Sequence, residues 1–76
     1  MPRITPVSWR VLEKVFLATG FHFARQEGSY RSYVKEGIHR PVVIPTYSEV
    51  PESIIRNNLK TVDISRDDYF SLLGRI

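Results

Sequence analysis

Two Glu-Gly dipeptides, at positions 27–28 and 36–37, constrain the fold of this chain more than any other feature. They separate three short segments, 21–26, 29–35 and 40–47, in which polar and apolar residues alternate or β-branched residues cluster. Such segments are typical of strands, and glycine turns between them are typical of hairpins. We therefore expect an antiparallel meander of three strands.

Helical patterns flank the predicted strands on both sides. Segment 9–19 repeats apolar residues at helical spacing, and Ser8 is placed to cap it. Pro51 suits the first position of a second helix, and Ser65 suits the cap of a short third helix that ends at Gly74. The sequence thus predicts a two-layer α+β domain in the order α-β-β-β-α-α, with helices on one face of a three-stranded antiparallel sheet. Function is expected on the open face and its hairpin turns.

The alternation also predicts which face each side chain occupies. Phe21, Phe23 and Arg25 share one parity of the first strand, so His22 should point to the open face if the phenylalanines point to the core. Prolines near both ends of the third segment cannot donate to a ladder, so this strand should be short or lie at an edge. The residues expected in the core are Trp9, Phe16, Phe21, Phe23, Ile44, Ile54, Leu59, Phe70 and Leu73.

The chain is short and mildly basic. Its 76 residues allow one domain, spanning 1–76, with 11 lysines and arginines against 8 acidic residues and a formal charge of +3. This charge suits an anionic partner, either nucleic acid or an acidic protein. The sequence has no cysteine and no apolar run of membrane-spanning length, so a cytoplasmic protein is expected. It also has no carboxylate cluster beside its two histidines and no phosphate-binding glycine loop, so neither a metal nor a cofactor is expected.

Several short motifs follow one another in an order that resembles a known family. They are Gly20-Phe21 after the first helix, Arg25-Gln26 and Gly28-Ser29 around the first hairpin, a tyrosine-bearing second strand, a Val-Ile-Pro third strand, Ile55 to Leu59 in the second helix and Ile64 to Phe70 leading into the third. This set, over residues 6–73, resembles the HicA (YcfA-like) toxins.

The resemblance implies a fold like that of a double-stranded-RNA-binding domain. It also implies the toxin component of a type II toxin–antitoxin system, an endoribonuclease that cleaves mRNA without the ribosome. Such toxins are neutralised by a HicB-like antitoxin that covers the active surface. The family's catalytic group is a histidine in a Gly-Ser-His or Gly-Asp-His pattern, where this chain has Gly28-Ser29-Tyr30. The resemblance therefore marks the position of Tyr30 as the site. This chain has a tyrosine at that position in place of the family's histidine.

A tyrosine changes what this position can do. RNA cleavage without a metal needs a group that removes a proton from the 2′-hydroxyl, and histidine suits this because its pKa is about 6.5. A tyrosine has a pKa of about 10, so only about one in a thousand is ionised at pH 7. We expect Tyr30 to donate a hydrogen bond or to stack on a base, with ordinary strand packing as the alternative. His22 is the candidate to stand in for the missing catalytic histidine, if a neighbouring strand brings it near Tyr30. His39 lies in the second turn region and does not match the motif position.

Cations gather on or beside the predicted hairpins, with tyrosines between them. Phosphates pair with cations and bases stack on aromatic rings, so this pattern is typical of an RNA-contacting sheet. The expected RNA contacts are Gly28, Ser29, Arg25, Arg31, Lys35 and Arg40, with Arg56 and Lys60 on the second helix. The alternative for each of them is a solvated charged surface.

Two functions stay open at this point. One is an mRNA endoribonuclease toxin, or a catalytically weakened form of it with Tyr30 in place of the family histidine. The other is a HicA-like module that binds RNA or an antitoxin without cleaving. An α+β domain of unrelated function is the third possibility.

Overall fold

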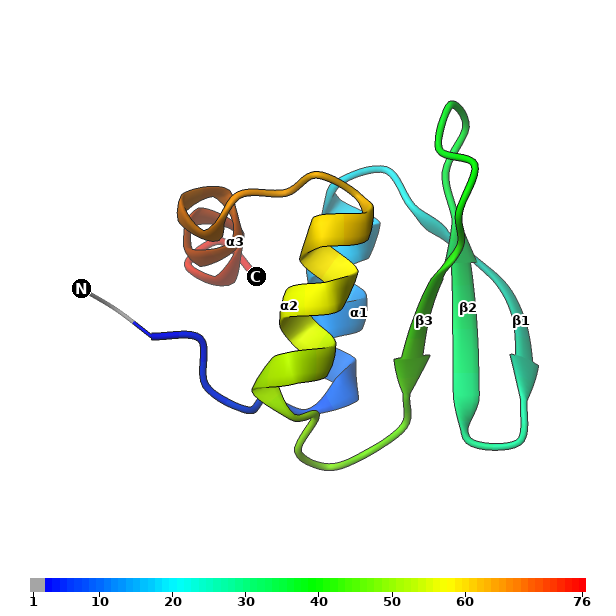
Figure 1. Ribbon diagram of the computed structural model, residues 1–76, viewed down its shortest axis with the longest axis horizontal. Helices are drawn as coiled ribbons and strands as arrows, with labels where there is room; N and C mark the ends of the chain where they lie inside the picture. Colours follow the sequence, from blue (N-terminus) through cyan, green and yellow to red (C-terminus); the bar gives the residue numbers. More distant parts are fainter. Residues whose placement is uncertain (1–2) are drawn as a thin grey trace.

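Three strands and three helices follow one another in the predicted order. The structure, a computed structural model, describes residues 3–76 (Figure 1). Its elements are α1 (Trp9–Ala18), β1 (His22–Glu27), β2 (Tyr30–Val34), β3 (Val42–Pro45), α2 (Glu52–Thr61) and α3 (Arg66–Leu73). The helices lie on one side of the sheet, which confirms the α+β architecture in the order α-β-β-β-α-α. Within residues 3–76, no helix has the length and apolar character needed to cross a membrane.

The sheet is a meander with the strand order β1-β2-β3, and each neighbouring pair is antiparallel. β3 is an edge strand of four residues, as its flanking prolines predict. The two connections lie at opposite ends of the sheet (Figure 1). Residues 28–29 form the tight turn from β1 to β2, and residues 35–41 form the longer loop from β2 to β3.

Local signals explain where the helices begin. Ser65 caps α3, because its Oγ accepts a hydrogen bond from the backbone N–H of Asp68 at 3.1 Å. Ser8 has the extended backbone of an N-cap, but its side chain makes no capping hydrogen bond. Pro51 is itself the N-cap of α2, so the expectation that it is the first helical residue is off by one position.

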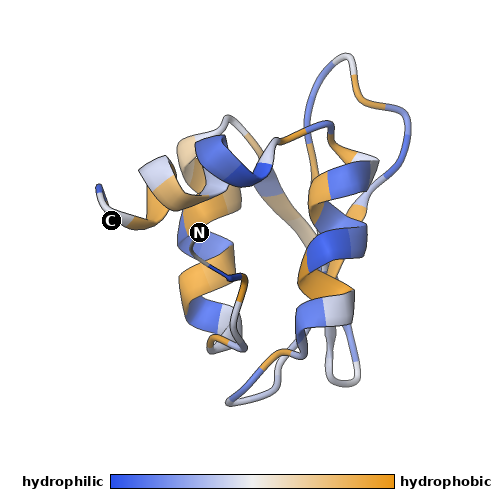
Figure 2. Cartoon of the chain, turned by 60° about the vertical axis from the view of Figure 1, so that its left-hand side comes forward, coloured by the Kyte–Doolittle hydropathy of each residue, from blue (hydrophilic) through white to orange (hydrophobic). Residues whose placement is uncertain are grey.

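The core lies between the helices and the helix-facing side of β2 and β3. α1 packs against β3 and α3, and α2 packs against β3. Hydrophobic and hydrophilic residues alternate around these helices, so each presents one apolar side to the interior (Figure 2). The buried core consists of Ile4, Leu12, Val15, Phe16, Phe21, Tyr33, Val42, Ile44, Val50, Ile55, Leu59, Val62 and Tyr69.

Most of the expected core is confirmed, with one clear error on β1. Phe16, Phe21, Ile44 and Leu59 are buried, and Trp9, Ile54, Phe70 and Leu73 are partly buried against the core. The prediction for Phe23 is wrong, because its side chain is 44% exposed. All six residues of β1 are exposed, since β1 is the edge strand farthest from the helices that pack on β3.

A β-bulge at Ala24 changes the faces of β1. Phe23 pairs with Tyr33 and Arg25 pairs with Ser32, which leaves Ala24 without a partner. Neighbouring residues of β2 point to opposite faces, so Phe23 lies on the helix-facing side and Arg25 on the open side. The expectation that Arg25 shares the face of Phe23 is therefore wrong. His22, which pairs with Val34, lies on the open face as predicted.

Candidate functional site

The turn between β1 and β2 is held from two directions. Gly28 has φ +58, a left-handed conformation that glycine adopts at little cost. The Gln26 side-chain amide donates to the Gly28 carbonyl at 3.0 Å. The Ser29 carbonyl accepts hydrogen bonds from the Thr46 backbone N–H at 2.7 Å and from the Thr46 hydroxyl at 3.0 Å. These contacts fix the backbone on which the predicted site rests.

Tyr30 follows this turn as the first residue of β2. Its neighbours across the sheet are Glu27 on β1 and Pro45 on β3. Tyr33, three residues later, faces the core, so Tyr30 faces the open side of the sheet. Its side chain is 49% exposed. About half of the Tyr30 side chain is thus open to solvent on this face, and the rest packs against its neighbours in the sheet.

His22 lies on the same face as Tyr30 but at the other end of the hairpin. It pairs with Val34, whereas Tyr30 pairs with Glu27. Four residues of β2 separate the two positions, or roughly 13 Å at about 3.3 Å per residue. The neighbouring strand therefore does not bring His22 close enough to Tyr30 to stand in for the missing catalytic histidine.

Arg25 is the cation nearest to Tyr30 on the open face. Its Nε lies 3.2 Å from Glu27 Oε1, and both side chains are more than two-thirds exposed. An exposed pair of this kind contributes little to stability and can exchange partners readily. The charges beside Tyr30 nevertheless cancel in this arrangement.

Arg31 points away from the open face and makes its contacts with other side chains of the same molecule. Its guanidinium donates to the Tyr33 hydroxyl at 3.0 Å, to Gln26 Oε1 at 2.8 Å and to Glu13 Oε2 at 3.1 Å. It also lies 4.2 Å from the centre of the Phe23 ring. Through these contacts Arg31 joins the exposed edge strand β1 to α1.

The contacts of Arg31 extend to the turn. Glu13 on α1 also accepts a hydrogen bond from the Tyr33 hydroxyl. Its carboxylate is thus bonded to two side chains of β2, Arg31 and Tyr33. From Arg31 the hydrogen bonds continue through Gln26 to Gly28. Burial and the bond to Glu13 raise the pKa of Tyr33 to about 12, so the phenol stays protonated and donates. Glu13, Arg31 and Gln26 thus support the turn that precedes Tyr30.

Lys35 is also committed to an internal contact. Its Nζ donates to the Thr19 carbonyl at 2.7 Å, at the C-terminal end of α1. A cation at this end of a helix is favoured by the helix dipole. The ammonium also lies 5.7 Å from the centre of the Phe21 ring.

The remaining predicted RNA contacts lie far from Tyr30. Arg40 and its neighbour His39 are exposed in the β2–β3 loop, at the end of the sheet opposite the 28–29 turn. Arg56 and Lys60 are exposed on α2, in the helical layer, and Arg56 pairs with Glu52 at 2.9 Å. The structure therefore brings only Gly28, Ser29 and Arg25 together with Tyr30.

A comparison with known protein families identifies the family of this chain. A family model described as the HicA toxin of bacterial toxin–antitoxin systems matches residues 9–64, from the start of α1 to just before α3. The chain belongs to the HicA toxin family. Membership assigns it a toxin role in a toxin–antitoxin system and implies an antitoxin as its partner. Neither a curated protein nor a solved structure matches the chain.

One neighbour of the predicted site in this HicA-family chain was missed by the sequence reasoning. Tyr47 follows β3 and is 43% exposed. The strand register makes it a neighbour of Tyr30, and the nearby Tyr30 phenol raises the pKa of Tyr47. The available signal was parity, because Tyr47 is two residues beyond Pro45, which pairs with Tyr30.

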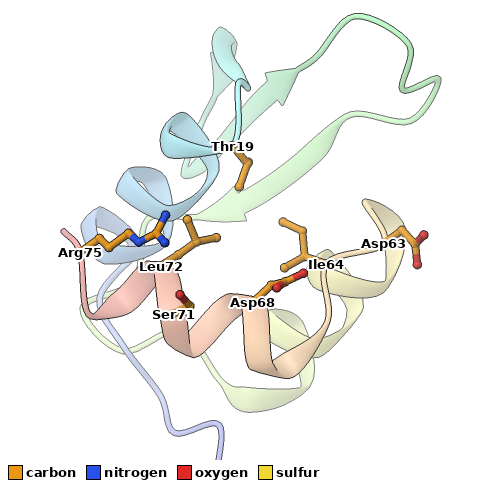
Figure 3. Close-up of a pocket in the computed structure, with 7 residues that line it drawn as sticks. All are labelled: Thr19, Asp63, Ile64, Asp68, Ser71, Leu72 and Arg75. Carbon is orange, nitrogen blue, oxygen red and sulfur yellow. The ribbon is translucent and has the colours of Figure 1, made fainter.

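Two hollows of the HicA-family chain lie in the helical layer. One is lined by Ile4, Arg56, Leu59, Lys60, Ile64 and Arg66 and is rich in cations. The other is lined by Thr19, Asp63, Ile64, Asp68, Ser71, Leu72 and Arg75 (Figure 3). In that view Asp63 points outward, away from the other side chains. Because all these residues lie on or beside the helices, neither hollow belongs to the face that carries Tyr30.

Proposed function

We propose that this chain acts on RNA through the 28–30 turn and the open sheet face beside it, as a toxin whose cleavage of mRNA is weak. The proposed site consists of Gly28, Ser29, Tyr30 and Arg25. In the same proposal, the partner that neutralises the toxin is a HicB-like antitoxin and the action takes place in the cytoplasm. Membership of the HicA toxin family supports the toxin role, and the exposed turn supports the location.

The observation that carries the proposal is that no histidine of residues 3–76 lies near Tyr30 and that the neighbouring carboxylate, Glu27, is paired with Arg25. His22 is at the far end of the hairpin, and Glu13 is occupied by Arg31 and Tyr33 on the other face. General acid–base catalysis needs a group of suitable pKa within hydrogen-bond reach of the proton that moves, and phenols serve poorly near neutral pH. Tyr30 instead offers a donor for a phosphate oxygen and a ring for a base. Binding is therefore retained and proton transfer is weakened.

The test compares RNA cleavage by the natural chain and by its Tyr30→His variant. Purified proteins are incubated with an mRNA transcript, and the cleavage rates are measured. General acid–base catalysis is worth about 100- to 10,000-fold in rate, so we expect Tyr30→His to cleave at least tenfold faster. A His22→Gln variant of each protein serves as the control and should change neither rate. Fast cleavage by the natural chain that survives Tyr30→Phe would overturn the proposal, because the chemistry would then lie elsewhere.

The second candidate is a HicA-family module that binds RNA or the antitoxin without cleaving. The same distance of Tyr30 from any histidine favours it, because within residues 3–76 neither His22 nor His39 lies near the turn. Slow cleavage by the natural chain that Tyr30→Phe abolishes would exclude this candidate. If both the natural chain and Tyr30→His leave RNA intact, while the natural chain still binds RNA, the second candidate replaces the first.

A further inference from the structure

Tyr30 and Tyr47 stand side by side at the same corner of the sheet. Tyr30 pairs with Pro45, and Tyr47 is two residues beyond Pro45 on the same chain. The hydrogen bond from the Thr46 N–H to the Ser29 carbonyl continues the ladder past β3. Tyr47 is therefore the diagonal neighbour of Tyr30 on the open face. Such neighbours have Cβ atoms roughly 7–8 Å apart, within reach of aromatic side chains.

The backbone on both sides of this pair is fixed. The Tyr47 carbonyl accepts a hydrogen bond from the Trp9 N–H at 3.1 Å, at the start of α1. Tyr30 follows the turn that Gln26 and Thr46 hold. The interaction between the phenols also raises the pKa of Tyr47. The backbones that carry the two rings are therefore fixed, which lowers the entropy lost when a ligand binds between or upon the rings.

Exposure distinguishes this pair from the other aromatic residues. Among residues 3–76, three aromatic side chains are strongly exposed, namely Phe23, Tyr30 and Tyr47. The guanidinium of Arg31 lies over the ring of Phe23 at 4.2 Å. Tyr33 and Tyr69 are buried. Two adjacent phenols on an open face have the form of a stacking platform for planar ligands.

We propose that Tyr30 and Tyr47 form a stacking site for an unpaired nucleobase. The inference rests on the proposed action on RNA and deepens it, because it names the state of the RNA and a residue that takes part. Bases in a duplex are stacked on one another, so only an unpaired base can insert against a protein ring. Tyr47 supplies the second aromatic ring of the site. Its contribution to binding comes from the face of the ring more than from the hydroxyl.

The charges near the pair support stacking over phosphate contact. Arg25 is paired with Glu27, and Glu27 is directly opposite Tyr30. Arg31 and Lys35 are committed to contacts on the other side of the sheet. Few counterions are then released on binding, and the affinity should depend only weakly on salt. We expect the slope of log K against log salt to correspond to about one or two phosphates, at about 0.7 per phosphate for single strands.

The experiment measures binding of short, fluorescently labelled RNAs to the whole chain by anisotropy. The probes are a single-stranded oligouridylate, the same backbone carrying abasic sites, and a blunt duplex. The variants are Tyr47→Ala, Tyr47→Phe and, as a matched control, Leu17→Ala, which removes a similarly exposed apolar side chain at the far end of α1. Far-ultraviolet circular dichroism verifies that each variant is folded.

The expected result is preferential binding of the single strand with its bases. Stacking of one base changes affinity by roughly five- to hundredfold, so Tyr47→Ala and the abasic probe should each lose affinity in this range. Tyr47→Phe keeps the ring and should recover most of that loss, and Leu17→Ala should bind like the natural chain. If RNA binds but neither Tyr47→Ala nor the abasic probe weakens binding, the stacking site is overturned while the proposed action on RNA stands. If none of the RNAs binds, the proposed function fails and the stacking site fails with it.

Discussion

At the scale of single residues, the same side-chain type serves different purposes at different positions. Arg25 is exposed on the open face, whereas Arg31 makes three hydrogen bonds beneath the sheet to Glu13, Gln26 and Tyr33. Removing one member of such a network leaves the other polar groups without partners, and that loss costs more than the bond itself contributes. We therefore regard Arg31 as a residue that positions the turn and Arg25 as the one available to a ligand.

Tyr33 makes the stability of the fold sensitive to alkaline pH. Its pKa is raised from 10.0 to about 12 in the folded chain, so the folded state holds this proton more tightly than the unfolded state. The stabilisation is complete below about pH 10 and is lost as pH rises towards about 12, at no more than about 1.4 kcal/mol per pH unit. We expect the free energy of unfolding in urea to fall between about pH 10 and about pH 12.

Tyr33→Phe is the variant that isolates this effect. Phenylalanine cannot ionise, so the variant should show a shallower decline with pH, although it is less stable at neutral pH because Glu13 loses a donor. The decline should not vanish, because burial also raises the pKa of Tyr69. A decline of unchanged steepness in Tyr33→Phe would show that Tyr33 is not the responsible group.

At the scale of secondary-structure elements, the decisive feature is the bulge in β1. It places Arg25 on the same face as His22 and Tyr30 and leaves Phe23 on the other face. An unbroken alternation would have put Arg25 beside Phe23 and left the open face without its cation. Bulges are common at sheet edges and near functional sites because they redirect one side chain without disrupting the whole strand.

The two serines that precede helices provide a matched test of capping. Ser65 Oγ accepts a hydrogen bond from the Asp68 N–H, whereas the Ser8 side chain makes no capping bond to α1. We expect Ser65→Ala to lower the free energy of unfolding by about 1 kcal/mol and Ser8→Ala to change it by less than about 0.5 kcal/mol. Urea unfolding followed by circular dichroism measures both. Equal losses in the two variants would mean that the hydrogen bond to Asp68 is not what stabilises α3.

At the scale of the whole molecule, the two sides of the chain differ in chemistry. The open sheet face carries two exposed tyrosines and a paired arginine, and the helical side carries the cation-rich hollow with Arg56, Lys60 and Arg66. A short RNA bound at the tyrosines meets the sheet side alone, because the core and both layers lie between the two surfaces (Figure 1). The expectation that Arg56 and Lys60 extend the same RNA surface therefore loses its geometric support.

A double variant, Lys60→Gln with Arg66→Gln, tests this separation. Both side chains are exposed, so folding should be little affected. We expect the affinity for a short single-stranded RNA to change less than about twofold and the slope of log K against log salt to stay the same. A slope that falls by about 0.7 for each lysine or arginine removed would show that these residues do contact phosphates.

The sequence by itself determined the order and type of the elements. Glycine turns, proline positions and the change between helical spacing and alternation are local signals, and local backbone preferences follow from them. The short edge strand between prolines and the Ser65 cap were both predictable in this way. The motif around Gly28 also located the turn that carries Tyr30, and with it the candidate site.

Only the tertiary structure decided which side chains this site contains. Periodicity assigns a parity to Phe23 and Arg25, but a bulge interrupts it, and burial depends on whether a helix covers the strand. Likewise, no local pattern shows that Arg31 bonds to Glu13, eighteen residues away, or that Tyr47 stands beside Tyr30. These pairings arise from packing between distant segments, whose free energy depends on contacts that neighbouring residues in the chain do not encode.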